Sequence, residues 1–361
     1  PVSEWHDAPL LYLSGAAAPQ FTDAQIDKLR QFVWQGGTIF SCTECSGQGF
    51  ASGIREVYAR AFPGYELKAL EPDHALYRAH RPLPARRVGF HMLSNGVRPW
   101  VIHTDADLPR VWQTQPFGGR DQYALDAAVN VALYVTNNQA LRNRGVALWP
   151  EKPTFTPAES VSVGRLKHGG NWNPEPLACE RFARLLGAAH KLEVERAGPL
   201  AADKLAEARP DLLLLTGTGP LELPAADRKA VADYVRAGGT LLVDAAGGDR
   251  AFAATAEGVL RETFGRDAWG LLDADSPVYR LKGMEVRRVR YRGSGREHEP
   301  LLKGVTLDGR VAVVFSPQDL TAGLMGYPCA GCVGHVPASA FALVRNVALY
   351  AAQNRKADRQ E

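Results

Sequence analysis

Long hydrophobic runs are missing from this 361-residue chain, and so are a strong excess of one charge and a dense set of cysteines. No apolar stretch approaches the roughly 18 residues that a membrane-spanning helix needs, and no leader of the signal-peptide kind opens the sequence. A net charge of +3 gives no reason to expect a nucleic-acid or membrane surface. Hydrophobic content of 45% and charged content of 22% are typical of a globular protein.

The chain does have enough length for two domains of ordinary size, each able to bury its own core. It starts at Pro1 instead of a methionine, so we expect a processed or excised piece of a longer protein, and secretion of the parent stays open. Four of the five cysteines form two C-x-x-C pairs, which leave the redox compartment undecided.

Four segments of the chain occur twice, and the second occurrence follows the first at a nearly constant distance. The pairs are LLYLSG (10–15) with LLLLTG (212–217), FVWQGGTIF (32–40) with YVRAGGTLL (234–242), EPDHALY (71–77) with DADSPVY (273–279), and NVALY (130–134) with NVALY (346–350). The offset is 202 for the first three pairs and 216 for the last, after insertions. A repeat of this length is a whole domain, so the sequence predicts a tandem duplication.

The second copy alternates apolar runs of strand length with helical patterns, which predicts a mainly parallel sheet covered on both faces. The first copy repeats this plan, with a capping box at Thr22 and Gln25, but it begins at the equivalent of the third strand. The counterpart of residues 161–196 is missing from it. We therefore expect an N-terminally incomplete α/β domain over residues 1–138, a proline-rich linker over 139–160, and a complete α/β domain over 161–361.

Several motifs resemble a known family. They are HGGNWNPEP, a strand ending in TG, a helix-GG-strand unit, FSPQDLTAG and a final NVALYA helix, with SCTECSGQGF and PDHALY in the first copy. Together they resemble the bacterial domain of unknown function 4159, which is grouped with class I glutamine amidotransferase-like, flavodoxin-like folds. The resemblance implies two tandem flavodoxin-like three-layer α/β domains. It brings no established activity and no cofactor.

Ligands in open α/β sheets bind beyond the carboxyl ends of the strands. In the second copy this rule selects Asn171, Trp172, Thr218, Asp244 and Asp319 as candidate ligand-binding residues. The alternative is structural: glycines in these loops make tight turns and the aspartates cap helices. None of the loops has the phosphate-binding or dinucleotide-binding glycine pattern.

A thiol with a nearby imidazole is the minimum for cysteine catalysis, and Cys45 with His74 is the candidate pair in the first copy. The second copy has Gly247 and Ser276 at these positions, so only one copy could act in this way. The glycine-flanked nucleophile turn of amidotransferase-like enzymes is absent. Whether the protein is an enzyme is therefore left uncertain.

A metal is the other chemistry to weigh. Cys42 and Cys45 could join Cys329 and Cys332 in a shared tetrahedral site, but the pairs lie about 280 residues apart, far beyond the usual spacing. Each pair occurs in one copy only, so we expect no shared metal and at most local disulfides, with free buried thiols as the further alternative. His103, Asp105 and Asp107 occupy the place of Ser316 to Asp319 and could ligate a metal or form an exposed polar loop.

Taken together, these features favour a non-catalytic ligand- or partner-binding α/β module. The family resemblance adds that it belongs to a larger bacterial, envelope-associated protein, with other domains of that protein or envelope proteins as partners. The alternative is a hydrolase or transferase of amidotransferase-like fold that acts on a small polar substrate at the carboxyl ends of the strands. No nucleic-acid partner and no membrane insertion of this segment are expected.

Overall fold

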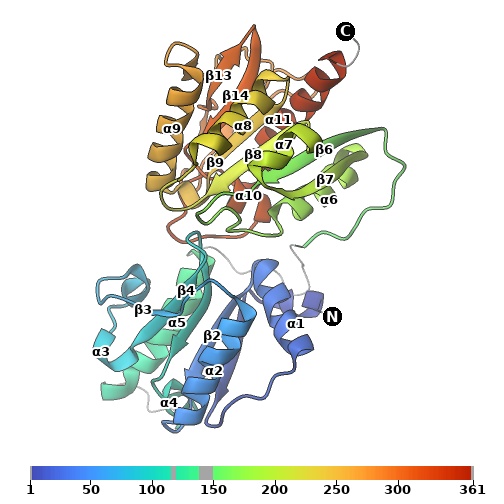
Figure 1. Ribbon diagram of the computed structural model, residues 1–361. Coiled ribbons are helices and arrows are strands. Elements are labelled where there is room, and N and C mark those ends of the chain that lie inside the picture. The colour runs from blue at the N-terminus through green and yellow to red at the C-terminus, as the bar shows by residue number, and fades with distance from the viewer. Residues whose placement is uncertain (1, 115–118, 138–148, 359–361) are drawn as a thin grey trace. The chain divides into compact units, whose positions relative to one another are not determined.

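The computed structural model describes residues 2–114, 119–137 and 149–358, and the chain forms two compact units. One unit comprises residues 1–149 with 327–330, and the other comprises 150–326 with 331–361. Each unit is an α/β domain built around one main sheet (Figure 1). Among the described helices, none combines the length and the apolar character that crossing a membrane requires.

The first domain has a five-stranded sheet in the order β1-β2-β5-β4-β3. Its elements are η1 (Val2–Asp7), β1 (Leu10–Gly15), α1 (Asp23–Trp34), β2 (Thr38–Thr43), α2 (Gln48–Ala61), β3 (Lys68–Ala69), η2 (Ala75–Arg78), α3 (Ala85–Val88), β4 (Phe90–Ser94), β5 (Pro99–Thr104), α4 (Leu108–Thr114), η3 (Gly119–Asp121) and α5 (Gln122–Thr136). Strands β1, β2 and β5 run parallel, whereas β4 and β3 are antiparallel additions.

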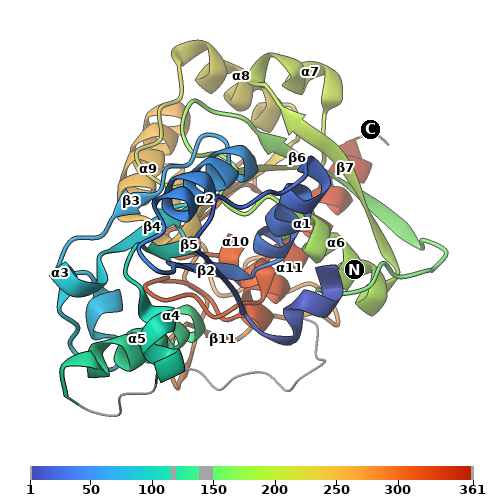
Figure 2. The ribbon, with the colours of Figure 1, turned by 90° about the horizontal axis from the view of Figure 1, so that it is seen from below.

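Helices cover both faces of this first sheet, as Figure 2 shows. Helices α1 and α2 pack on one face over a core that includes Phe32, Ile39 and Ile54. Helices α4 and α5 pack on the other face over Phe40, Ile102 and related residues. Because successive strand side chains point to opposite faces, Ile39 and Phe40 enter different cores.

The second domain has a seven-stranded sheet in the order β10-β13-β14-β9-β8-β6-β7. Its elements are β6 (Glu159–Leu166), α6 (Ala178–His190), β7 (Leu192–Leu200), η4 (Ala202–Lys204), α7 (Leu205–Ala208), β8 (Leu212–Gly217), α8 (Ala225–Arg236), β9 (Thr240–Ala245), η5 (Ala246–Gly248), α9 (Arg250–Phe264), β10 (Trp269–Leu271), β11 (Val289–Arg290), β12 (Glu297–His298), β13 (Lys303–Leu307), β14 (Arg310–Ser316), α10 (Thr321–Met325) and α11 (Pro337–Asp358). Five strands are parallel, β13 and β10 are antiparallel, and β11 with β12 forms a separate ribbon.

The predicted duplication is confirmed in the topology. The order β1-β2-β5-β4-β3 repeats as β8-β9-β14-β13-β10, with corresponding helices between the strands. The sheet register shows which residues of the two copies are equivalent. Ile39 pairs with Val101 in the first sheet, and Leu241 pairs with Val313 at the same place in the second. The offset is therefore 202 at β2 and 212 at β5.

Side-chain hydrogen bonds repeat at the same positions. The phenolic oxygens of Tyr77 and Tyr279 accept the backbone N–H of Phe90 at 2.9 Å and of Leu302 at 3.1 Å. Arg98 and Arg310 each donate to two carbonyl oxygens at the end of the first repeated helix and in the turn that follows it. These bonds fix the same loops in both domains, so they belong to the framework of the repeat.

Strands β6 and β7 and helix α6 have no counterpart among the described residues of the first domain. Strand β1 therefore ends the first sheet, whereas its equivalent β8 lies between β9 and β6. Strand β6 begins at Glu159, two residues inside the predicted linker.

Candidate functional site

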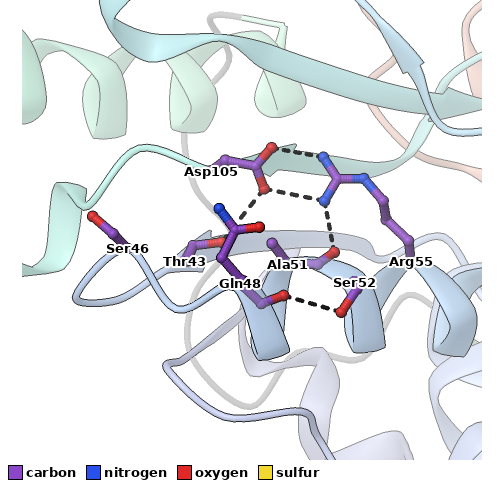
Figure 3. Close-up of a pocket in the computed structure, with 7 residues that line it drawn as sticks. All are labelled: Thr43, Ser46, Gln48, Ala51, Ser52, Arg55 and Asp105. Atoms are coloured by element: carbon purple, nitrogen blue, oxygen red, sulfur yellow. Dashed lines mark hydrogen bonds and ion pairs between the residues drawn. The ribbon is translucent and has the colours of Figure 1, made fainter.

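A pocket of about 400 Å³ opens at the carboxyl end of β2 in the first domain. Seven residues line it: Thr43, Ser46, Gln48, Ala51, Ser52, Arg55 and Asp105 (Figure 3). They come from the end of β2, the loop between β2 and α2, the first turns of α2 and the segment after β5. This is the edge at which open α/β sheets bind ligands.

One charged pair dominates the pocket. Arg55 on α2 donates two hydrogen bonds to Asp105, from Nη1 to Oδ1 at 3.1 Å and from Nη2 to Oδ2 at 2.7 Å. Nη1 also donates to the carbonyl oxygen of Ala51 at 2.6 Å, which fixes the guanidinium over its own helix. Hydrogen bonding to Arg55 lowers the pKa of Asp105 to about 2, although the side chain is 47% exposed. The pocket therefore holds a carboxylate that is ionised at neutral pH, paired with the guanidinium of an arginine.

Behind Asp105, a chain of buried polar groups runs into the core. The hydroxyl of Tyr58 donates to Ser41 Oγ at 2.8 Å, and Ser41 Oγ lies 2.8 Å from His103 Nδ1. His103 Nε2 lies 2.9 Å from Asp105 Oδ1. An ionised Asp105 can only accept, so the hydrogen of His103 sits on Nε2 and points at the carboxylate. In a neutral imidazole Nδ1 is then the acceptor, and Ser41, which accepts from Tyr58, donates its own hydrogen to it.

Burial affects the protonation of His103 within this row of polar groups. Ser41 and His103 are 0% exposed, and desolvation lowers the pKa of His103 while the hydrogen bond to Asp105 raises it. A neutral imidazole with one donor and one acceptor fits the bonds on both sides. We call Tyr58, Ser41, His103, Asp105 and Arg55 the polar network.

The local sequence explains how the network assembles. All six residues of β2 are buried, and Ser41 shares the face of Ile39, toward α1 and α2. Arg55 and Tyr58 stand three residues apart on α2, so they lie on one side of the helix. Arg55 meets Asp105 at the rim, and Tyr58 meets Ser41 beneath it.

The second domain has none of these groups. The repeat offset places Val243 at the position of Ser41, Leu260 at Tyr58 and Phe315 at His103, and all three lie in the apolar core. At the rim, Glu257 stands for Arg55 and Pro317 for Asp105. Every member of the polar network is therefore specific to the first copy, and the fold forms without it in the second.

The loop after β2 carries an unusual backbone. Cys45 and Ser46 both have positive φ, at 49° and 53°, where the second domain has Gly247 and Gly248 at 68° and 72°. Left-handed geometry costs a residue with a Cβ of order 1 kcal/mol or more. Asp107 holds the loop by accepting the N–H of Cys45 at 2.9 Å. The equivalent Asp319 accepts the N–H of Gly247 at 2.8 Å.

Cys45 and His74 are not brought together. Cys45 is exposed in the β2–α2 loop, whereas His74 caps η2, with its ring beside Tyr134 on the last turn of α5. No hydrogen bond joins the thiol to an imidazole within the described ranges. The geometry offers Cys45 no general base in this state.

The remaining cysteine and metal candidates are placed as follows. No disulfide joins any of Cys42, Cys45, Cys179, Cys329 and Cys332, and burial raises the pKa of Cys42. Within residues 2–114, 119–137 and 149–358, no group of three or more histidine, cysteine or carboxylate side chains could hold a metal ion. The expectation of an exposed loop at His103 is wrong: this residue is the buried fifth residue of β5.

In the second domain, the predicted ligand-binding residues form two groups. Asn171 Nδ2 donates to Thr218 Oγ1 at 2.8 Å, which joins two of the predicted loops. Trp172 lies 5.7 Å from the guanidinium of Arg165 and 5.8 Å from the ammonium of Lys167. These residues stay predictions for ligand binding, and their observed contacts are with their own domain.

Asp244 and Asp319 form the second group, and both carboxylates accept backbone N–H groups of one short helix. Asp244 accepts from Leu320 and Thr321, and Asp319 accepts from Ala322 and Gly323, at 2.9–3.0 Å. Burial, together with the neighbouring Asp319, raises the pKa of Asp244 to about 7. Their hydrogen bonds are those of caps for α10, a helix distant in sequence from Asp244, and their role in ligand binding stays a prediction.

The sequence interpretation missed Ser41, Tyr58 and Arg55. All three could have been found by comparing the two copies, because each lies where the offset is still 202. The equivalent residue in the second copy is apolar or oppositely charged in each case. His103 lies beyond the insertion, where the offset changes to 212.

The comparison with known proteins adds one family. The family described as Domain of unknown function (DUF4159) matches residues 3–136 and again residues 162–352. No curated protein matches the chain.

Proposed function

The chain belongs to the DUF4159 family through two tandem copies of its domain, and on that premise we propose that it is a non-catalytic ligand-binding module. The pocket between β2, β5 and α2 of the first domain is the proposed site, and a small polar molecule is the proposed ligand. The observation that carries this proposal is the polar network. The second copy shows that an apolar core suffices for the fold at these positions, so the network serves the pocket.

Binding is favoured over catalysis by the direction of the network. In a hydrolytic triad the serine faces the substrate and the carboxylate lies behind the histidine. Here Ser41 is fully buried and Asp105 faces the pocket, so the order is reversed. The inner groups hold Asp105 in place and carry no nucleophile to the surface.

The lining indicates the chemistry of the ligand. Arg55 and Asp105 present opposite charges, while Thr43, Ser52 and Gln48 offer hydroxyl and amide groups. A volume of about 400 Å³ lies in the range of small-molecule sites. A compact ligand with both hydrogen-bond donors and acceptors, such as an amino acid or an amino sugar, matches this lining.

A direct test uses nuclear magnetic resonance with panels of free amino acids, amino sugars and hydroxy acids. We expect at least one compound to shift the amide resonances of residues 43–55, with affinity lowered about tenfold or more in Arg55→Gln or Asp105→Asn, since each removes a charge-assisted bond. Glu257→Gln, at the position of Arg55 in the second copy, is the matched control. Binding that ignores Arg55→Gln, or no binding by any compound, contradicts the proposal.

One observation favours the alternative of a hydrolase or transferase. The exposed thiol of Cys45 stands beside the pocket residue Ser46, on backbone that glycine would adopt more easily. Strained backbone of this kind often marks functional positions. If a ligand of the pocket turns over chemically and Cys45→Ser abolishes the turnover while binding persists, this alternative replaces the binding module.

The setting of the module is proposed from the family resemblance. We place it in a larger bacterial, envelope-associated protein, with other domains of that protein or envelope proteins as partners. Fractionation of cells that carry a tagged copy at the native locus tests this, and recovery of the tag only in the cytosolic fraction contradicts it.

A further inference from the structure

The second domain has a pocket of its own, with a volume of about 300 Å³. Its walls come from η4, α7 and α8, which lie side by side (Figure 1), and from Arg355 near the end of α11. Arg209 comes three residues before β8, and Ala237 comes three residues before β9. The pocket therefore lies at the amino ends of these strands, at the opposite edge of the sheet from the predicted ligand-binding loops.

Much of this lining is apolar. It includes Leu205, Ala206, Ala230 and Tyr234. The hydroxyl of Tyr234 lies 3.0–3.3 Å from three backbone carbonyl oxygens, so its single hydrogen is already used and the phenol adds apolar surface to the wall. A volume of about 300 Å³ is at the lower end of the range for small-molecule sites, so a ligand here must be compact.

Arg355 places a buried cation in this wall. Its side chain is 8% exposed, and its Nη1 donates to the carbonyl oxygen of Ala237, the residue that ends α8. Its Nε is buried and has no hydrogen-bond partner among the described residues, and no ion pair joins its guanidinium to a carboxylate of that part of the chain. Capping α8 uses one of the five guanidinium hydrogens. Because buried charges are normally paired, the remaining donors suit an anion.

The other charged side chains of the pocket leave an excess of positive charge. They are Asp203, Arg209 and Asp233, and all three are exposed. Asp233 Oδ2 accepts from Lys229 Nζ at 2.6 Å, so its charge is balanced by a residue outside the lining. Two arginines then face one carboxylate, that of Asp203, which leaves one positive charge. This balance favours a ligand with a single negative charge.

We propose that this pocket binds a small monocarboxylate with an apolar body, such as a branched-chain or aromatic acid. The carboxylate pairs with the guanidinium of Arg355, and Arg209 adds positive charge at the rim. The apolar body lies against Leu205, Ala206 and Ala230. Guanidinium and carboxylate match in geometry, and their hydrogen bonds are charge-assisted. The site is independent of the pocket beside Arg55 and of the function proposed for that pocket.

The test titrates the intact protein with isovalerate, phenylacetate and benzoate, each compared with its uncharged amide. We expect at least one acid to shift the amide resonances of residues 202–209 and 230–237, and its amide to bind about tenfold more weakly or worse. Arg355→Gln should weaken the acid about tenfold or more, although its side-chain amide can still donate to Ala237. Arg236→Gln, an exposed residue of α8 outside the lining, is the matched control and should leave the affinity unchanged.

A second variant tests the cavity apart from its charge. Ala206→Leu adds volume at an exposed helical position of the lining, so it should weaken the acid without unfolding the domain, even if Arg355→Gln fails to fold.

Three outcomes overturn the proposal. They are the absence of binding by all three acids, equal binding of acid and amide, and binding that survives both Arg355→Gln and Ala206→Leu. Tighter binding of valine than of isovalerate, abolished by Asp203→Asn, also overturns it, by assigning Asp203 to a zwitterionic ligand. Arg55→Gln should leave the binding unchanged, so failure of the first pocket would not be mistaken for failure of this one.

Discussion

Replacing the buried part of the polar network by the residues of the second copy should separate stability from function. The changes are Ser41→Val, Tyr58→Leu and His103→Phe, made singly and together. They copy Val243, Leu260 and Phe315, which pack at these positions in the same fold. The triple variant replaces all three hydrogen-bonding side chains by the apolar ones that the same fold packs in the second copy.

The expected loss in the free energy of unfolding depends on which buried groups lose their hydrogen-bond partners. Ser41→Val alone leaves the Tyr58 hydroxyl and His103 Nδ1 buried without their 2.8 Å partner. Each unsatisfied buried group costs about 1–3 kcal/mol, so the single change should lower the free energy of unfolding by about 2–6 kcal/mol. In the triple variant these groups are gone, and the remaining cost is that of packing the added volume, about 1–3 kcal/mol.

Urea unfolding, followed by circular dichroism and tryptophan fluorescence, measures these free energies. The affinity for the ligand of the pocket measures binding. We expect the triple variant to lose less stability than Ser41→Val but to bind the ligand about tenfold more weakly, since Asp105 loses the His103 hydrogen bond that orients it. A triple variant that loses as much stability as Ser41→Val would refute the reasoning, because the network would then be part of the fold itself.

Four further predictions concern the same two domains. Burial holds the pKa of His103 below its ordinary 6.5, so the unfolded first domain binds that proton more tightly, and its stability should fall as pH drops below about 6.5; His103→Phe should flatten this slope in urea unfolding. Burial, together with the neighbouring Asp319, raises the pKa of Asp244 from 3.8 to about 7, so its contribution to stability should instead fall as pH rises from about 4 to about 7, and Asp244→Asn should reduce that slope while the raised pKa of Asp319 keeps part of it. Asn130 makes four hydrogen bonds to residues 76–81 from a fully buried side chain, so Asn130→Ala should cost about 2–4 kcal/mol in the same assay. Iodoacetamide should label Cys45 within minutes and Cys42 only on unfolding, as mass spectrometry of peptides would show, because Cys45 is exposed and Cys42 is buried.

Internal repetition made most of the fold predictable from the sequence. LLYLSG and LLLLTG identified β1 and β8, and the paired glycines marked the ends of α1 and α8. The flavodoxin-like assignment and the ligand roles stay predictions. Some strands begin a few residues away from the predicted position, because polar residues at their ends, such as Glu159, also pair with the neighbouring strand. Backbone hydrogen bonds at these ends form whether or not the side chains alternate between apolar and polar.

The candidate site was less predictable for a physical reason. Ser41, Tyr58 and His103 come from β2, α2 and β5 and have no local spacing in common. A serine in a buried strand signals nothing until the sheet register sets a histidine opposite it. Asp244 is the reverse case, because the sequence predicts a ligand-binding role for a carboxylate at a strand end. Its hydrogen bonds to the start of α10 join residues far apart in the sequence, so only the structure shows them.

In the part of the chain that the structure describes, β1 pairs on one side only, and this has a consequence for the order in which the chain is synthesised. Translation completes the first domain before the second, and β6 leaves the ribosome about fifty residues ahead of β8, its final partner. Over that interval β1, whose sequence is similar to that of β8, is the earlier-made of the two strands. A β6 that paired with β1 would have to leave it before β8 could take its native place beside β6. In a chain of two related domains, a segment that bound the β1 edge early would leave β6 free to pair with β8.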